Sequence, residues 1–272
     1  MTDPLSVFLR DLPANTPRHG WVNHHDVYEK KLGLEKAMKE NHALSPFLVF
    51  LEVPEKAFEE ATIETGVFRL HDTLFTYSHH LRCLVLEIQS ATHRAAREAA
   101  TFLFDKKVDD MGLYSSLRRP GPIGRKYDDV SKQPDAQWMP TVSTEDPSKP
   151  TIFLEVGTSV SRARVESEAK RWLTYPNSPI TMVILVMVHQ HTEINMQVLG
   201  GYRKPQFSMA GQRMESTVIR SNSSTCVDGI VAIPFEFIFW RKKEKPKEHD
   251  VVFDEDDLSS FAESIWKTQG LI

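Results

Sequence analysis

Two segments of the chain repeat their apolar residues with the period of an α-helix. Residues 90–104 (SATHRAAREAATFLF) are rich in alanine, and residues 161–175 end directly before a proline. The apolar stripe is Ala95, Ala99, Phe102 and Leu103 in the first segment, and Val165, Ala169, Trp172 and Leu173 in the second. This spacing predicts two helices, each with one buried face.

Other runs of the chain are typical of β-strands. They are residues 135–142 (DAQWMPTV), 151–156 (TIFLEV), 180–188 (ITMVILVMV), 194–199 and 230–240. Residues 180–188 are almost entirely apolar, as in a strand buried on both faces, and the alternating run 194–199 is expected to pair with them. Helices and strands in this order predict an α/β fold, in which helices flank a mixed sheet.

The two ends of the chain show weaker patterns. Residues 27–41 are amphipathic and indicate a helix, residues 47–53 are apolar, and residues 258–266 predict a short helix near the C-terminus. The apolar residues 251–253 are expected to pack back on the body of the protein. We expect three parts: a mostly helical N-terminal extension over 1–85, an α/β core over 86–245, and an acidic linker with a C-terminal helix over 246–272.

Composition narrows the class of protein. The 272 residues are 40% hydrophobic and 26% charged, which supplies a sizeable core and excludes a wholly disordered chain. The chain has 33 basic and 37 acidic residues and a net charge of -4. It therefore cannot coat nucleic acid through its bulk charge, and any such contact requires a local basic patch.

The sequence also indicates a compartment. Its two cysteines, Cys83 and Cys226, cannot build a disulfide framework, which favours a reducing environment. The start of the chain (MTDPLSVFLRDLP) lacks the pattern of a signal peptide, and the longest apolar run is about half as long as a membrane span. We expect an intracellular protein, cytoplasmic or nuclear, without a membrane partner.

Two carboxylates are placed where chemistry is expected. Asp135 opens one predicted strand, and Glu155 ends the apolar run of the next. An ionised glutamate in such a run is costly to bury without a partner. Two carboxylates that converge at one edge of a sheet can bind a hard cation, Mg²⁺ or alternatively Mn²⁺, which stabilises charge on a phosphate.

Other short motifs are absent or incomplete. The histidines at 24–25, 79–80, 189 and 191 lack the partner spacing of a zinc site. The sequence contains no GxxxxGK[ST], GxGxxG or GxSxG, which disfavours the corresponding nucleotide-binding folds and a hydrolase with a serine nucleophile. His93, one turn before Arg97 and Glu98, either faces a site at this edge or is a half-buried helix residue.

The segments QPDAQWMP, TIFLEVG and ESEAKRWL, with a serine-rich turn before the last, resemble the PD-(D/E)XK nuclease superfamily. The similarity is greatest to a fungal branch of this superfamily and covers roughly residues 90–199, with a further similar segment near 258–266. It implies a restriction-endonuclease-like core and a nuclease activity that depends on Mg²⁺.

The resemblance also implies roles for individual residues. Asp135 matches the aspartate of PD and Glu155 the acid of (D/E)XK, so both would be catalytic metal ligands. The family's lysine two residues further on would point to the same face, but Gly157 stands there. In some branches the lysine projects from the following helix, where Lys170 is the candidate, and Glu98 would complete the site.

Each of these residues also has a simpler interpretation. Asp135 can be an ordinary carboxylate at the start of a strand, and Glu98 a surface residue. Lys170 can be a solvated lysine paired with Glu166 one turn earlier.

Several basic residues are candidates for substrate binding. Lys132 lies three residues before Asp135 and is a second cation for a phosphate. A loop rich in glycine and proline carries four more, Arg118, Arg119, Arg125 and Lys126. Such a loop can contact a nucleic-acid backbone without reading its sequence, or it can simply be solvated. The basic run 241–247 is either a nuclear-import signal or a solvated linker.

The sequence thus supports two hypotheses. The first is a Mg²⁺-dependent phosphodiesterase that cleaves DNA or another nucleic acid and can form a homodimer. The second is a catalytically inactive restriction-endonuclease-like domain that acts as a binding or scaffold module, because Gly157 replaces the usual lysine.

Overall fold

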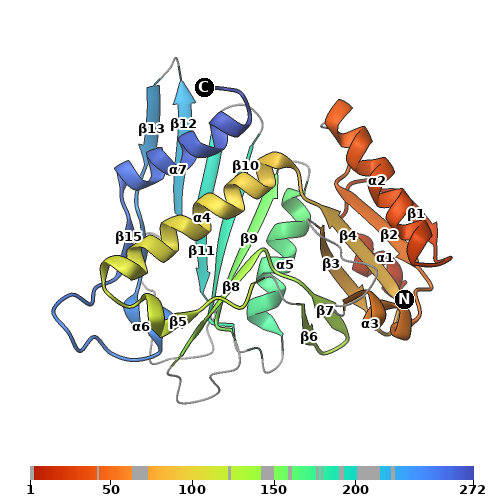
Figure 1. Cartoon of the computed structure of the whole chain (residues 1–272), viewed down its shortest axis with the longest axis horizontal. Helices are drawn as coiled ribbons and strands as arrows, with labels where there is room; N and C mark the ends of the chain where they lie inside the picture. Colours follow the sequence, from red (N-terminus) through yellow and green to blue (C-terminus); the bar gives the residue numbers. More distant parts are fainter. Residues whose placement is uncertain are drawn as a thin grey trace. The chain divides into compact units, whose positions relative to one another are not determined.

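In a computed structural model, the chain forms two compact units (Figure 1). The structure describes residues 3–41, 43–62, 73–121, 124–141, 150–158, 161–175, 178, 180–189, 193–200, 215–221 and 224–272. The first unit contains residues 1–90 together with 123–134 and 160–164, and the second contains 91–122, 135–159 and 165–272. The two short insertions into the first unit were not expected from the sequence.

The first unit is built on a six-stranded mixed sheet, where the sequence led us to expect mostly helices. Its strands, in spatial order, are β1 (Arg18–Gly20), β2 (Phe47–Leu51), β4 (Cys83–Ile88), β3 (Thr73–Ser78), β7 (Val130–Lys132) and β6 (Arg125–Tyr127). Only β1 and β2 are parallel among these neighbours. The last strand, β6, comes from the basic loop that was a candidate for nucleic-acid contact.

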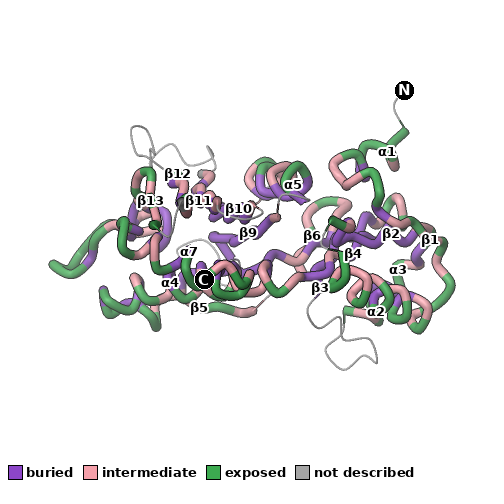
Figure 2. The backbone as a smooth tube through the Cα atoms, turned by 90° about the horizontal axis from the view of Figure 1, so that it is seen from above, coloured by how far each residue is buried: buried purple, intermediate pink, exposed green. Residues whose placement is uncertain are grey.

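Three helices cover the two faces of this sheet, as the view in Figure 2 shows. They are α1 (Pro4–Leu9), α2 (His24–Glu40) and α3 (Glu55–Thr62). Phe8 of α1 packs with Phe47 and Val49 on one face, whereas Val27 of α2 and Phe58 of α3 belong to the apolar cluster of the other face. The alternation of side chains along each strand supplies both clusters.

The second unit contains a seven-stranded sheet, and the sequence predicted a mixed sheet in this part of the chain. In spatial order its strands are β13 (Ser224–Asp228), β12 (Glu215–Ser221), β11 (Glu193–Gly200), β10 (Met182–Val188), β9 (Ile152–Thr158), β8 (Ala136–Pro140) and β5 (Leu117–Arg118). The strands β9 and β10 are parallel and joined through α5 (Arg162–Thr174), and the other neighbours are antiparallel. The mixed α/β fold with helices on a mixed sheet is therefore confirmed.

Helices lie on both faces of the sheet in the second unit. α4 (Ala91–Asp110) and α7 (Glu255–Thr268) cross one face, and α5 lies on the other (Figures 1 and 2). The main core fills the space between α4, α7 and the sheet, and every residue of β10 is buried. Among the described residues, no helix is both long and apolar enough to cross a membrane.

Two predicted elements differ in detail from the structure. The buried stripe of α4 is His93, Ala96, Ala100, Leu103, Phe104 and Val108, so the predicted stripe is displaced and Phe102 is 70% exposed. The run 230–240 is not one strand, because Pro234 ends β14 (Val231–Ile233) and begins α6 (Phe235–Phe239). β14 pairs with β15 (Val251–Phe253), so residues 251–253 do pack back on the body.

Candidate active site

The first carboxylate of the candidate site, Asp135, is buried at the start of β8. Its backbone N–H donates a hydrogen bond of 3.1 Å to the carbonyl of Leu154 in the neighbouring strand β9. Its Oδ2 accepts one of 2.9 Å from the backbone N–H of Val156, and its Oδ1 lies 2.6 Å from Nε2 of His93. The carboxylate is therefore fixed in orientation by one strand and one helix.

His93 supplies the helix side of this arrangement and is itself buried. It lies in the first turns of α4, on the side of the helix that faces the sheet core. The structure thus decides between the two interpretations of His93, because its ring contacts Asp135 directly. The position of His93 also explains why the buried face of α4 differs from the predicted one, since the buried stripe that continues from His93 includes Ala96 and Ala100.

The second carboxylate, Glu155, is buried in β9 and points toward a different helix. Its Oε1 accepts a hydrogen bond of 2.5 Å from the indole Nε1 of Trp172 in α5. Phe153, two residues earlier, packs edge-on against the same ring at 4.6 Å. The neighbours of Glu155 in the strand, Leu154 and Val156, belong to the core cluster on the α4 face of the sheet. Asp135 and Glu155 are thus held by different helices.

The metal site predicted from these two carboxylates stays a prediction. Among the described residues, no three histidine, cysteine or acidic side chains lie together as metal ligands. A pair of carboxylates with water still fits Mg²⁺, which takes one or two protein carboxylates and retains its other waters.

The position of the family's lysine is filled by packing. A Cβ atom added to Gly157 would lie 2.7 Å from Sδ and 2.8 Å from Cε of Met187, and 3.2 Å from Cγ2 of Val165. Met187 and Val165 form a small apolar cluster with Leu185 between β10 and α5. A lysine at position 157 would have to displace this cluster, so glycine here is a consequence of local packing.

Lys170, the alternative lysine, lies in α5 but is exposed. The buried stripe of this helix is Val165, Glu168, Ala169 and Trp172, which largely confirms the predicted one. Lys170 borders that stripe, and Arg171 next to it forms an ion pair of 3.2 Å with Glu168.

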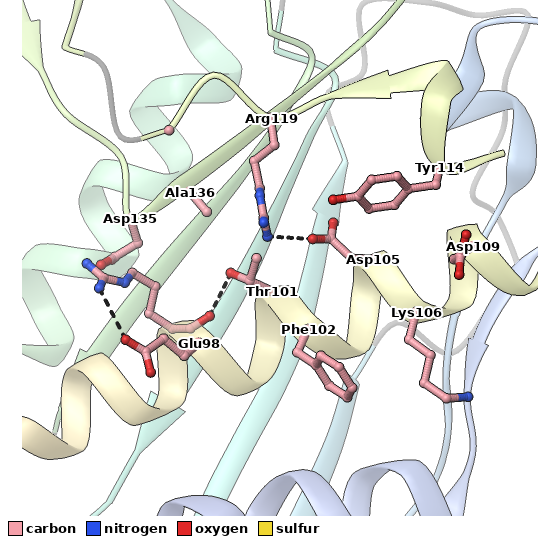
Figure 3. Close-up of a pocket in the computed structure, with 12 residues that line it drawn as sticks. Glu98, Thr101, Phe102, Asp105, Lys106, Asp109, Tyr114, Arg119, Asp135 and Ala136 are labelled. Carbon is pink, nitrogen blue, oxygen red and sulfur yellow. Dashed lines mark hydrogen bonds and ion pairs between the residues drawn. The ribbon is translucent and has the colours of Figure 1, made fainter.

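Glu98, in contrast, lies with Asp135 in one open groove along α4 (Figure 3). The cavity has a volume of about 690 Å³. It is lined by Arg97, Glu98, Thr101, Phe102, Asp105, Lys106, Asp109, Tyr114, Arg119, Gly121, Asp135 and Ala136. The Glu98 side chain is 73% exposed, so it is accessible, whereas Asp135 forms part of the inner wall.

Two of the acidic side chains in the groove, Glu98 and Asp105, each lie beside an arginine. Nη2 of Arg97 lies 3.7 Å from Oε1 of Glu98. Arg119 forms an ion pair with Asp105, whose other oxygen accepts a hydrogen bond of 2.8 Å from Nε1 of Trp138. Asp105 therefore orients Arg119 toward the groove (Figure 3).

The predicted basic residues are divided between the two units. Arg118 and Arg119 belong to the second unit, and only Arg119 lines the groove. Arg125, Lys126 and Lys132 belong to the first unit, in the hairpin of β6 and β7. Lys132 is buried there, and Nζ of Lys126 lies 3.8 Å from Glu55.

Comparisons with known proteins found a distant likeness among solved structures. No profile of a known protein family matches the chain, and no curated protein matches its sequence. A solved structure from Anabaena variabilis, provisionally described as a nuclease belonging to DUF820, is similar in fold with a TM-score of 0.40 and 13% identity. The similarity covers 69% of this chain and 90% of that one.

Three residues of this region had no functional role predicted from the sequence. Trp172 was counted only as a core residue, although an indole N–H needs a partner when it is buried. Arg97 and Asp105 lie on α4 near Glu98, at spacings of one and seven residues, and helical spacing alone places Asp105 on its side of the helix. The ion pair between Asp105 and Arg119 joins residues 14 apart and had no signal in the sequence.

Proposed function

We propose that this chain is a member of the PD-(D/E)XK superfamily that hydrolyses phosphodiester bonds in DNA with Mg²⁺ as cofactor. The observation that carries the proposal is that Asp135 and Glu98 line the same open groove as Arg97 and Arg119. The proposal differs from the motif-based site in one respect: Glu98 takes the place of Glu155 as the second carboxylate of the metal site.

The donor set of the groove fits a hard cation. Asp135 and Glu98 both offer carboxylate oxygens, which are the ligands that such a cation prefers. Mg²⁺ or Mn²⁺ held there would neutralise the charge of the phosphate and would lower the pKa of a bound water molecule.

The remaining groups of the groove suit a phosphate ester. The guanidinium groups of Arg97 and Arg119 can each donate two hydrogen bonds to phosphate oxygens. The four acidic and three basic side chains in the lining leave the groove slightly acidic on its own. A phosphate backbone would therefore enter most favourably together with a cation, which links substrate binding to the metal.

The rival function is a catalytically inactive binding module, and a specific observation favours it. The space beside Gly157 is filled by Met187 and Val165, Glu155 is bonded to Trp172, and Lys170 is exposed. The position of the motif's lysine is thus occupied by a glycine packed against apolar side chains, and the alternative lysine is exposed.

Metal titration and cleavage together separate the two functions. We expect calorimetry with Mn²⁺ to detect binding that Glu98→Gln and Asp135→Asn remove, and we expect the same variants to lose Mg²⁺-dependent cleavage of plasmid and single-stranded DNA. Asp110→Asn is the matched control, because Asp110 is an exposed acid of the same helix outside the groove lining. Metal binding that survives both variants would contradict the site, and absence of both binding and cleavage would establish the inactive module.

A further inference from the structure

A chain of three polar side chains in the first unit has the geometry of a nucleophile with its base. Oγ of Ser131 lies 2.8 Å from Nε2 of His79, and Nδ1 of the same ring lies 2.7 Å from Oε1 of Glu55. Glu55 begins α3, His79 follows β3, and Ser131 is the central residue of β7. Residues far apart in sequence are thus brought into one line by the fold.

The surrounding elements hold this arrangement in place. β3 and β7 are antiparallel neighbours in which Tyr77 lies opposite Ser131. The ring of His79 packs edge-on against Tyr77 at 4.9 Å and against Phe58 of α3 at 5.9 Å. Phe58 in turn stacks on Tyr77 at 4.1 Å, so the imidazole is fixed between the sheet and the helix.

The two hydrogen bonds require a defined protonation of the histidine. A carboxylate accepts only, so Nδ1 of His79 carries the proton and donates to Glu55. Nε2 is then free to accept the hydroxyl proton of Ser131 in the neutral ring. This tautomer is the one that a general base needs.

We propose that Ser131 is a nucleophile, that His79 is its general base, and that Glu55 is the positioning residue of a second site. The site would act on small acyl esters and is separate from the groove on α4. Ser131 is 8% exposed and the His79 side chain 13%, which restricts the substrate to a small acyl group.

The reaction follows from the three roles. The Oγ–C bond forms as the hydroxyl proton moves to Nε2 of His79. The bond between the acyl carbon and the alcohol oxygen then breaks, and the alcohol leaves with that proton. Water, deprotonated by the same nitrogen, then bonds to the acyl carbon. The bond between that carbon and Oγ breaks, the carboxylic acid leaves, and Oγ takes back a proton from Nε2.

The absence of GxSxG does not conflict with this proposal. That motif belongs to one fold, in which the serine lies on a turn between a strand and a helix, whereas Ser131 lies within a strand. The same three roles recur on unrelated folds in different chain orders, so they are recognised by geometry and not by sequence.

Labelling of the intact protein with phenylmethylsulfonyl fluoride tests the nucleophile. We expect the O–S bond to form at Ser131 with loss of fluoride, and peptide mass spectrometry to locate the adduct. His79→Asn should lower the labelling rate by about 100-fold or more. Ser78→Ala is the matched control, since Ser78 is a buried serine of the same sheet that donates to Asp129 at 2.7 Å.

The role of Glu55 requires a readout that a structural contact would not change. We expect Glu55→Gln to shift the pH profile of labelling, Glu55→Asp to restore it in part, and Glu59→Gln, at an exposed acid one turn further along α3, to leave it unchanged. Folding of each variant is checked by circular dichroism. An unlabelled Ser131 in the folded wild type, or equal labelling in His79→Asn, would overturn the proposal without affecting the metal site.

Discussion

Nε2 of His93 and Oδ1 of Asp135 lie 2.6 Å apart, and both side chains are buried. This contact joins the first turns of α4 to the start of β8, and it fixes the carboxylate that the family motif assigns to the metal. A buried polar group that loses its partner retains the full cost of leaving water. The contact is therefore important for stability as well as for the proposed site.

We predict that His93→Ala destabilises the protein by about 3 kcal/mol, because it leaves the Asp135 carboxylate buried with one partner fewer. Urea unfolding followed by circular dichroism measures this free energy. His25→Ala, at an exposed histidine, is expected to change it by less than about 0.5 kcal/mol. Equal effects of the two substitutions would contradict the structural role of His93.

Substitutions of two glycines should change the free energy of unfolding in opposite directions. Gly157→Ala is expected to cost about 1 kcal/mol, since the added methyl group meets the end of Met187 and Val165. Gly157→Lys should cost more, because the ammonium group would enter an apolar cluster. Gly33→Ala, in the exposed middle of α2 with no atom within 4 Å, should stabilise by about 0.5–1 kcal/mol. Thermal unfolding of the three variants checks the order.

The basic run 241–247 is held by Glu248, whose contribution to stability is expected to depend on pH. The Arg241 guanidinium donates to both oxygens of Glu248, and with backbone N–H groups of residues 244 and 245 it lowers the pKa of Glu248 to about 2. Because the unfolded pKa is 4.5, this stabilisation is complete above pH 4.5 and is lost as the pH falls toward 2.

Glu248→Gln should therefore flatten the decline of unfolding free energy below pH 4.5, relative to wild type. Chemical denaturation at a series of pH values measures this slope. Glu244→Gln is the control, because Glu244 is exposed and contributes its backbone N–H to the contact. An unchanged slope in Glu248→Gln would contradict the assigned cause.

The two thiols should differ in reactivity. Burial raises the pKa of Cys83 to about 11, whereas Cys226 is exposed. The raised pKa also means that Cys83 stabilises the fold below pH 9.0, the unfolded pKa, and that this contribution declines as the pH rises toward 11. We expect Ellman's reagent to modify one thiol in the native protein and two after unfolding, and Cys226→Ser to abolish the native reaction.

Much of the second unit follows from local pattern alone. The strand β10 is apolar along its length because both of its faces are covered, and the helix α5 was located by its stripe. The stripe of α4 could not be placed to the residue, since Phe102 appears as suitable for the core as Phe104. A helix whose first half is rich in alanine has several nearly equivalent apolar faces, and the contact of His93 with Asp135 selects one.

In the candidate site, too, the sequence indicates the residues, whereas the tertiary structure decides their contacts. The residue types and their order along the chain singled out Asp135 and Glu155, because short-range patterns record where a strand begins and which residues interrupt an apolar run, whereas Glu98 was implied by the family resemblance. The partner of each carboxylate depends on which face of the sheet it occupies and on which helix covers that face. Glu155 meets Trp172 under α5, and Asp135 meets His93 under α4. Such pairings join residues 17 and 42 positions apart, and only the packing of the whole chain decides them.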